Sequence, residues 1–144
     1  MIRVAVQQED FDPAAELAAL EALGGGAVAS FTGIVRGEDG ISALTLDHYP
    51  GMTEAALQTL AEEAMRRWPL LGVIVLHRVG RVEAGRRIVF VGTAAAHRGA
   101  ALEACAFLID RLKTDAPFWK KEHRADGDRW VEARHADEAA ARRW

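Results

Sequence analysis

The sequence predicts an α+β fold with a largely antiparallel sheet and helices packed on it. Short apolar segments that alternate or are rich in valine and isoleucine come in pairs, as strands do. Single segments with helical periodicity separate these pairs. Paired strands divided by single helices are typical of α+β proteins. A chain of 144 residues suits one domain with a real core, so we expect a single domain over residues 1–144.

The chain should begin with a strand and a short helix. Residues 2–6, IRVAV, alternate as strand residues do. Asp12 offers an N-cap, and Pro13 suits the first helical position. The glycines at 24–26 end this helix.

Two further strands and a longer helix are expected next. Residues 27–36 and 43–49 are joined by the polar loop GEDGIS, and we expect them to form a hairpin. Thr53 can cap the following helix, which Pro69 ends. Its apolar stripe consists of Leu57, Leu60, Ala61, Ala64, Met65 and Trp68.

The second half opens with another strand pair, residues 73–80 and 87–96, around a turn at 83–85. A helix over 98–114 follows. Its apolar stripe consists of Leu102, Cys105, Leu108, Ile109 and Leu112.

Two lysines stand on either side of a proline in the stretch RLKTDAPFWKKEH. Pro117 disfavours helix at the residue before it, so Lys113 should lie in the last helical turn and Lys120 in a following strand. That strand, FWKKEH, should pair with DRWVEAR through a turn at 125–127. A short helix over 137–143 should close the chain.

Composition excludes several classes of protein. A net charge of −3 and a pI near 5.9 argue against a general nucleic-acid binder, so any anion site must be local. A single cysteine cannot form an internal disulfide. The apolar runs are too short to cross a bilayer, and the start MIRVAVQQED lacks the apolar core of a signal peptide. We therefore expect a cytoplasmic protein.

Each lysine has a structural interpretation and a chemical one. Lys113 suits the helix dipole and could keep its ammonium group in water. Lys120 shares a strand face with Phe118, opposite Trp119, and could also be solvated. If both enter one pocket, repulsion and desolvation would lower their pKa values, leaving one as a base or nucleophile and the other as an anion clamp.

Other residues could complete an anion pocket. His97 and Arg98 stand where a strand meets a helix start, which favours an anion, although a capping turn with a surface arginine explains them equally well. Arg36 ends a strand and is either solvated or a second anion contact. Cys105 lies in an apolar stripe, where a buried structural thiol is expected. Residues 47–49 carry no spacing that completes a metal site.

Several longer motifs resemble one family. They are FTGIVR, LTLDHYPGMTE, RWPL, HRVG, IVFVGTAAAHR, LKTDAPFWKKE and GDRWVEAR. They resemble the large, catalytic subunit of molybdopterin synthase, the MoaE family, and run in order from about residue 27 to residue 144. The resemblance implies an α/β hammerhead-like fold without a metal or cofactor. The loop GEDGIS looks shorter than that of many family members, which bears on substrate access.

The resemblance implies a sulfurtransferase of molybdenum cofactor biosynthesis. Cyclic pyranopterin monophosphate would receive two sulfur atoms and become the dithiolene molybdopterin. The donor would be the C-terminal Gly-Gly thiocarboxylate of a small ubiquitin-like partner subunit. The implied assembly is a heterotetramer built on a homodimer of large subunits.

The resemblance also implies roles for particular residues. Lys113 and Lys120 match the catalytic lysines, and Lys113 would either shuttle protons or capture the acyl group of the tail, two roles that the sequence leaves open. The implied substrate-binding residues are Arg36, His97, Arg98, Arg134 and Glu122. Arg134 would reach the pocket from the neighbouring protomer, and Glu122 would orient Lys120.

Two other functions compete with this one. A noncatalytic anion-binding scaffold would hold the partner's acidic C-terminus in the same basic pocket, and it predicts binding without turnover. A phosphate-processing enzyme would need metal-binding carboxylates or a glycine-rich loop, which the sequence lacks.

Overall fold

The computed structural model describes residues 1–131 and 135–144. The strands are β1 (Ile2–Gln7), β2 (Ala27–Ile34), β3 (Ile41–His48), β4 (Leu70–Arg78), β5 (Gly80–Glu83), β6 (Arg87–Ala95), β7 (Phe118–Arg124) and β8 (Arg129–Val131). The helices are α1 (Pro13–Glu21), α2 (Met52–Arg67), α3 (Arg98–Asp115) and α4 (His135–Ala141), with a 3-10 turn, η1 (Glu38–Gly40).

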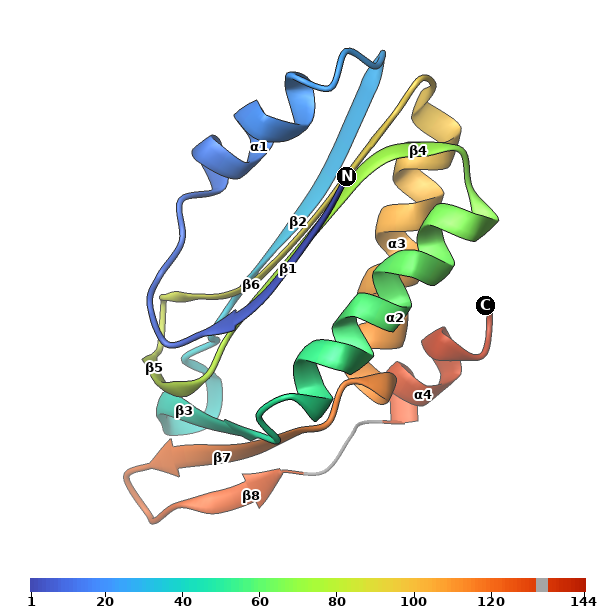
Figure 1. The fold of residues 1–144 in the computed structure, drawn as a ribbon. Helices are drawn as coiled ribbons and strands as arrows, with labels where there is room; N and C mark the ends of the chain where they lie inside the picture. Colours follow the sequence, from blue (N-terminus) through green and yellow to red (C-terminus); the bar gives the residue numbers. More distant parts are fainter. Residues whose placement is uncertain (132–134) are drawn as a thin grey trace.

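The strands form two sheets (Figure 1). The first has the order β1-β4-β6-β2, and the second, at one end of helices α2 and α3, has the order β5-β3-β7-β8. Among the strands described, β1 and β4 are the one parallel pair. The predicted α+β class with a largely antiparallel sheet is therefore confirmed.

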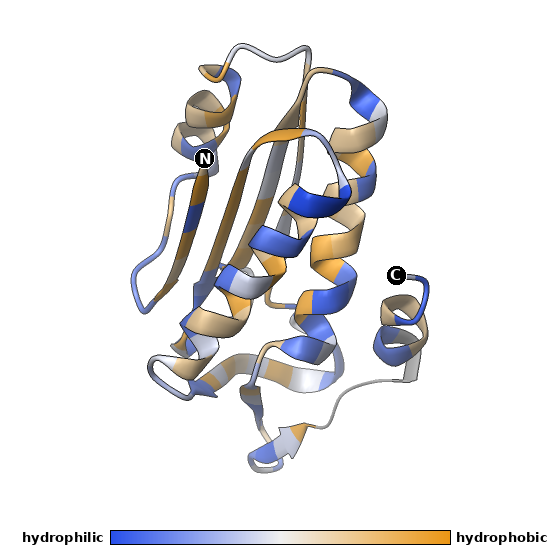
Figure 2. Cartoon of the chain, turned by 45° about the vertical axis from the view of Figure 1, so that its right-hand side comes forward, coloured by the Kyte–Doolittle hydropathy of each residue, from blue (hydrophilic) through white to orange (hydrophobic). Residues whose placement is uncertain are grey.

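Helices α2 and α3 cover one face of the first sheet and α1 covers the other (Figure 1). Side chains of β4 point alternately to the two faces of the first sheet. Val73 and Val75 belong to the core under α2 and α3, whereas Ile74 and Leu76 belong to the core under α1. Figure 2 shows hydrophobic residues along these strands and hydrophilic ones on the outer surfaces of the helices. In the part of the chain described, no helix is long and apolar enough to cross a membrane.

Most predicted elements are confirmed. The Asp12 carboxylate accepts a hydrogen bond from the Ala14 amide at 3.0 Å and caps α1. Strands β4 and β6 pair, as do β7 and β8, and Lys113 lies in the last turn of α3. Residues 132–134 of the predicted last strand lie outside the described residues. Helix α4 begins two residues before its predicted start, residue 137.

The predicted hairpin of residues 27–36 and 43–49 is wrong. Strand β2 pairs with β6 in the first sheet, whereas β3 pairs with β5 and β7 in the second. Asp39 and Gly40 have positive φ angles of 56° and 77° in the connecting loop. The loop that contains these two residues leads from the first sheet to the second.

Thr53 is not the cap of α2. Gly51, with φ of 87°, holds that position, and its amide donates to the Glu54 carboxylate at 3.1 Å. The buried Thr53 hydroxyl instead accepts from the Tyr49 amide at 3.1 Å and donates to the Pro117 carbonyl at 3.3 Å. The start of α2 is thereby fastened to the segment that leads into β7.

Leu102 does not belong to the buried stripe of α3, because 59% of its surface is exposed. The buried face consists of Ala101, Ala104, Cys105, Phe107, Leu108 and Leu112. Ala101, Cys105, Leu108 and Leu112 recur at the spacing of one helix face, and Leu102 lies one position away from it.

Candidate active site

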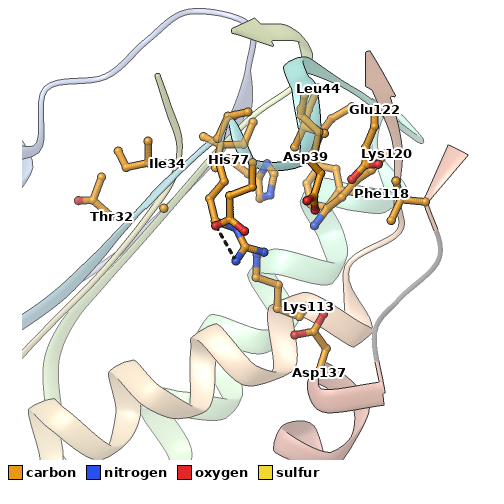
Figure 3. Close-up of a pocket in the computed structure, with 18 of the residues that line it drawn as sticks. Thr32, Ile34, Asp39, Leu44, His77, Lys113, Phe118, Lys120, Glu122 and Asp137 are labelled. Atoms are coloured by element: carbon orange, nitrogen blue, oxygen red, sulfur yellow. Dashed lines mark ion pairs between the residues drawn. The ribbon is translucent and has the colours of Figure 1, made fainter. Parts of the chain in front are cut away.

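A cavity of about 510 Å³ opens where the two sheets meet the C-terminal end of α3 (Figure 3). Its walls are residues 31–36 of β2 and the segment after it, residues of η1, the inner face of β3, and alternate residues of β7. Strands that are distant in sequence meet here because the loop after β2 carries the chain from the first sheet to the second. The cavity is therefore a product of tertiary structure.

Both lysines line this cavity, from different elements. Lys113 enters from the last turn of α3 and Lys120 from β7. Phe118, Lys120 and Glu122 face the cavity together, as the predicted alternation requires, whereas Trp119 is 44% exposed. Figure 3 shows the two lysine side chains around one hollow. The structure thus brings together the two groups that the proline separates in sequence.

Glu122 also lines the cavity, and its partner is an arginine that the sequence reasoning missed. Arg124 donates from Nε and Nη2 to Glu122 Oε1 at 3.0 and 2.6 Å, and Glu122 is buried. The hydrogen bond to Glu122 raises the pKa of the Arg124 guanidinium. Arg124 Nη1 also donates to the Asp39 carbonyl at 2.9 Å. Strand alternation, which puts Arg124 on the face of Lys120 and Glu122, could have found it.

Arg36 lies at the rim of the cavity. Its side chain is 58% exposed and pairs with Glu38 at 3.5 Å. A solvated pair of this kind adds little to stability, so the guanidinium is available to a ligand at small cost.

His77 is a second cavity residue that sequence reasoning did not single out. It lies on β4 and is buried, and its ring stacks on Phe118 with centroids 3.9 Å apart. Burial, with a further contribution from the charges of Lys113 and Lys120, lowers its pKa from 6.5 to about 3. The available signal was a polar residue at the end of the apolar run VIVLH.

His97 and Arg98 do not reach this cavity in one chain. They stand exposed at the N-terminal end of α3, and Lys113 lies fifteen positions after Arg98 along the helix. At 1.5 Å per residue this is about 22 Å. His97 and Arg98 thus lie far from the two lysines, and Arg134 lies outside the described residues.

Cys105 is buried, as its place in the α3 stripe predicts. Its thiol lies 4.0 Å from the Val91 carbonyl oxygen, and burial raises its pKa to about 11. A thiol in this state is a poor nucleophile. Within residues 1–131 and 135–144, no three His, Cys, Asp or Glu side chains gather as a metal site.

Comparison with known proteins identifies the family of this chain. The model of the MoaE protein family matches residues 6–115, more than half of the chain. The chain belongs to the MoaE family. The molybdopterin synthase catalytic subunit of Pseudomonas aeruginosa is 58% identical over 98% of this chain and 97% of its own length. The MoaE protein of Burkholderia ambifaria has a solved structure that is 52% identical, with a TM-score of 0.86 over 100% of this chain and 98% of that one.

A more distant family structure is a complex. It is the protein-protein complex of subunits 1 and 2 of the molybdopterin-converting factor from Helicobacter pylori. One chain of that complex is 26% identical to this chain, and the two superpose with a TM-score of 0.73 over 92% of this chain and 91% of that one. The MoaE-like fold and the family expected from the sequence motifs are confirmed. As a MoaE-family catalytic subunit the chain is an enzyme of molybdenum cofactor biosynthesis.

Proposed function

We propose that this catalytic subunit transfers sulfur from the C-terminal thiocarboxylate of a small ubiquitin-like partner to cyclic pyranopterin monophosphate. Two such transfers, one sulfur atom from each thiocarboxylate, yield the dithiolene of molybdopterin. The observation that supports this best is the entry of Lys113 and Lys120 into one cavity from two elements. Both the tail and the substrate are anions, and two ammonium groups beside Arg36 suit them.

Two alternative roles of a lysine are compatible with sulfur transfer. A neutral lysine amine can take up a proton as sulfur adds to the pterin side chain, or it can hold the acyl group of the tail once the sulfur has left. In both cases the second ammonium group balances the charge of the carboxylate or thiocarboxylate. Cys105 takes no part, because the sulfur arrives on the partner's terminus.

His97 and Arg98 fit this function only if a second copy of the chain supplies them. About 22 Å of helix separates Arg98 from Lys113 within one chain. In a two-fold dimer of large subunits, each copy would present the start of α3 to the cavity of the other, and Arg134 would enter the same composite site. The heterotetramer would carry one partner subunit at each such cavity.

The test is reconstitution with the thiocarboxylated partner and cyclic pyranopterin monophosphate, with the dithiolene product measured by mass spectrometry. Lys113→Ala should abolish nearly all product. Lys121→Ala is the matched control, because Lys121 lies on the other face of β7, with its ammonium nitrogen 5.5 Å from the ring centroid of Trp130. Binding of the tail without product from the unaltered protein would favour the noncatalytic scaffold and refute the proposal.

A further inference from the structure

The cavity contains a buried histidine to which sulfur transfer as proposed above assigns no task. His77 lies on β4, on the same face as Val73 and Val75, where an apolar side chain would fill the core. It is 3% exposed. A polar ring at this position costs desolvation free energy, so its presence here needs a physical reason.

The hydrogen bonding of His77 determines which of its nitrogens carries the proton. Nδ1 lies 2.8 Å from the Arg78 carbonyl oxygen, and a carbonyl oxygen can only accept. Nδ1 is therefore the donor, and Nε2 of the neutral ring is an acceptor. Since the pKa is lowered to about 3, the ring keeps this form throughout the neutral range.

The surroundings of His77 are the two lysines and the strand that carries one of them. Charged and titratable groups face it from three elements, namely Lys113 of α3, Lys120 of β7 and His48 of β3. His77, Lys113, Lys120 and Phe118 also share a second, small cavity of about 30 Å³ beside the large one. The ring stacks on Phe118 at 3.9 Å and 23°, and so contacts the cavity-facing row of β7 directly.

We propose that His77 is a positioning residue for the two lysines, through Nε2 as a hydrogen-bond acceptor for an ammonium group at the cavity floor. The Arg78 carbonyl holds the ring in the required tautomer, and the stack on Phe118 holds its plane. A neutral acceptor orients an ammonium group without adding a charge to a pocket that must take two anions. This role rests on the proposed sulfur transfer, but it can be tested without it.

Three variants distinguish the hydrogen-bond acceptor role of His77 Nε2 from the packing role of its ring. His77→Phe keeps a stacking ring without an acceptor. His77→Gln reaches the Nε2 position with an amide oxygen, and His77→Asn, one methylene shorter, does not. If the acceptor matters, His77→Gln should keep most of the turnover number, while His77→Phe and His77→Asn lose roughly 10- to 100-fold, the cost of misplacing a reacting group. KM should change less than kcat, because the cavity walls remain.

A second measurement is independent of turnover. Acetylation by limiting acetic anhydride is followed at each lysine by peptide mass spectrometry as a function of pH, with Lys121 as the internal reference. Loss of the acceptor destabilises the ammonium form, so Lys113 or Lys120 should react at lower pH in His77→Phe and His77→Asn than in the parent and His77→Gln. Thermal melting identifies any variant that does not fold, in which case the Gln and Asn pair decides.

The results test the positioning role of His77 and the proposed sulfur transfer separately. If His77→Phe matches the parent in turnover and labelling, or if His77→Gln is no better than His77→Asn, the positioning role is overturned and the ring is only a packing residue. If the parent itself makes no product, sulfur transfer fails, while the labelling profiles still decide what His77 does.

Discussion

Subunit complementation tests whether one active site is built from two copies of the chain. Lys113→Ala removes one of the two cavity lysines, and Arg98→Ala removes an arginine at the other end of α3, about 22 Å away. If Arg98 acts in the cavity of the neighbouring copy, a mixed dimer has one site with both lesions and one site with neither. Random exchange makes half of all dimers mixed, so activity should recover to about a quarter of the parent value.

The assay is product formation after the two inactive variants are unfolded together and refolded, with exchange verified by native mass spectrometry. A mixture of Lys113→Ala and Lys120→Ala is the matched control. Both lysines line one cavity of one chain, so every site in the mixed dimer carries one lesion and activity should stay low. If the first mixture exchanges fully and remains inactive, the composite site is refuted.

Three other predictions follow from single side chains. Folding lowers the pKa of His77 from 6.5 to about 3, so below pH 6.5 this histidine is protonated in the unfolded chain but not in the folded one. The free energy of unfolding should therefore fall by about 2–3 kcal/mol between pH 7 and pH 4.5 because of this residue. Urea unfolding at pH 7 and pH 4.5 should show this loss in the parent and in exposed-site control His97→Gln, but not in His77→Gln. Arg124→Gln should raise KM for the pterin roughly 10-fold, because it leaves the Asp39 carbonyl and the Glu122 carboxylate without their arginine partner. The control Arg129→Gln, which loses only an exposed ion pair with Asp126 at 3.6 Å, should leave KM unchanged. Equal KM values for the two variants would contradict this. Cys105, with its pKa raised to about 11, should resist iodoacetamide at pH 8 until the protein unfolds, and loss of activity in a folded Cys105→Ala would contradict its structural role.

Local patterns in the sequence were enough to predict most helices and strands. They also predicted the apolar face of α2 and the face of β7 that carries Phe118 and Lys120. Helix propensity, the Asp12 cap and the break at Pro117 depend on residues a few positions apart. For the same reason the sequence assigns Lys113 to a helix end and Lys120 to the strand face that carries Phe118. The motifs around these residues also identified the MoaE family.

Pairing between strands could not be predicted in the same way. Residues 27–36 and 43–49 look like a hairpin because each has a strand pattern and the loop between them is short. Strand β2 nevertheless pairs with β6, and β3 with β5 and β7, since these partners bury the apolar faces of both sheets. Such pairings depend on contacts tens of residues apart, which no local pattern records.

The candidate site shows the same difference between what local sequence predicts and what only the fold decides. The sequence by itself determined the types of residue that the chemistry needs, with Lys113, Lys120 and Glu122 each on a predictable element and Arg36 two residues beyond the end of β2. Only the tertiary structure brought these four into one cavity, left His97 and Arg98 at the far end of α3, and added Arg124 and His77. The physical reason is that a cavity is formed by surfaces that meet, and the meeting of two sheets and a helix is decided by packing of the whole chain.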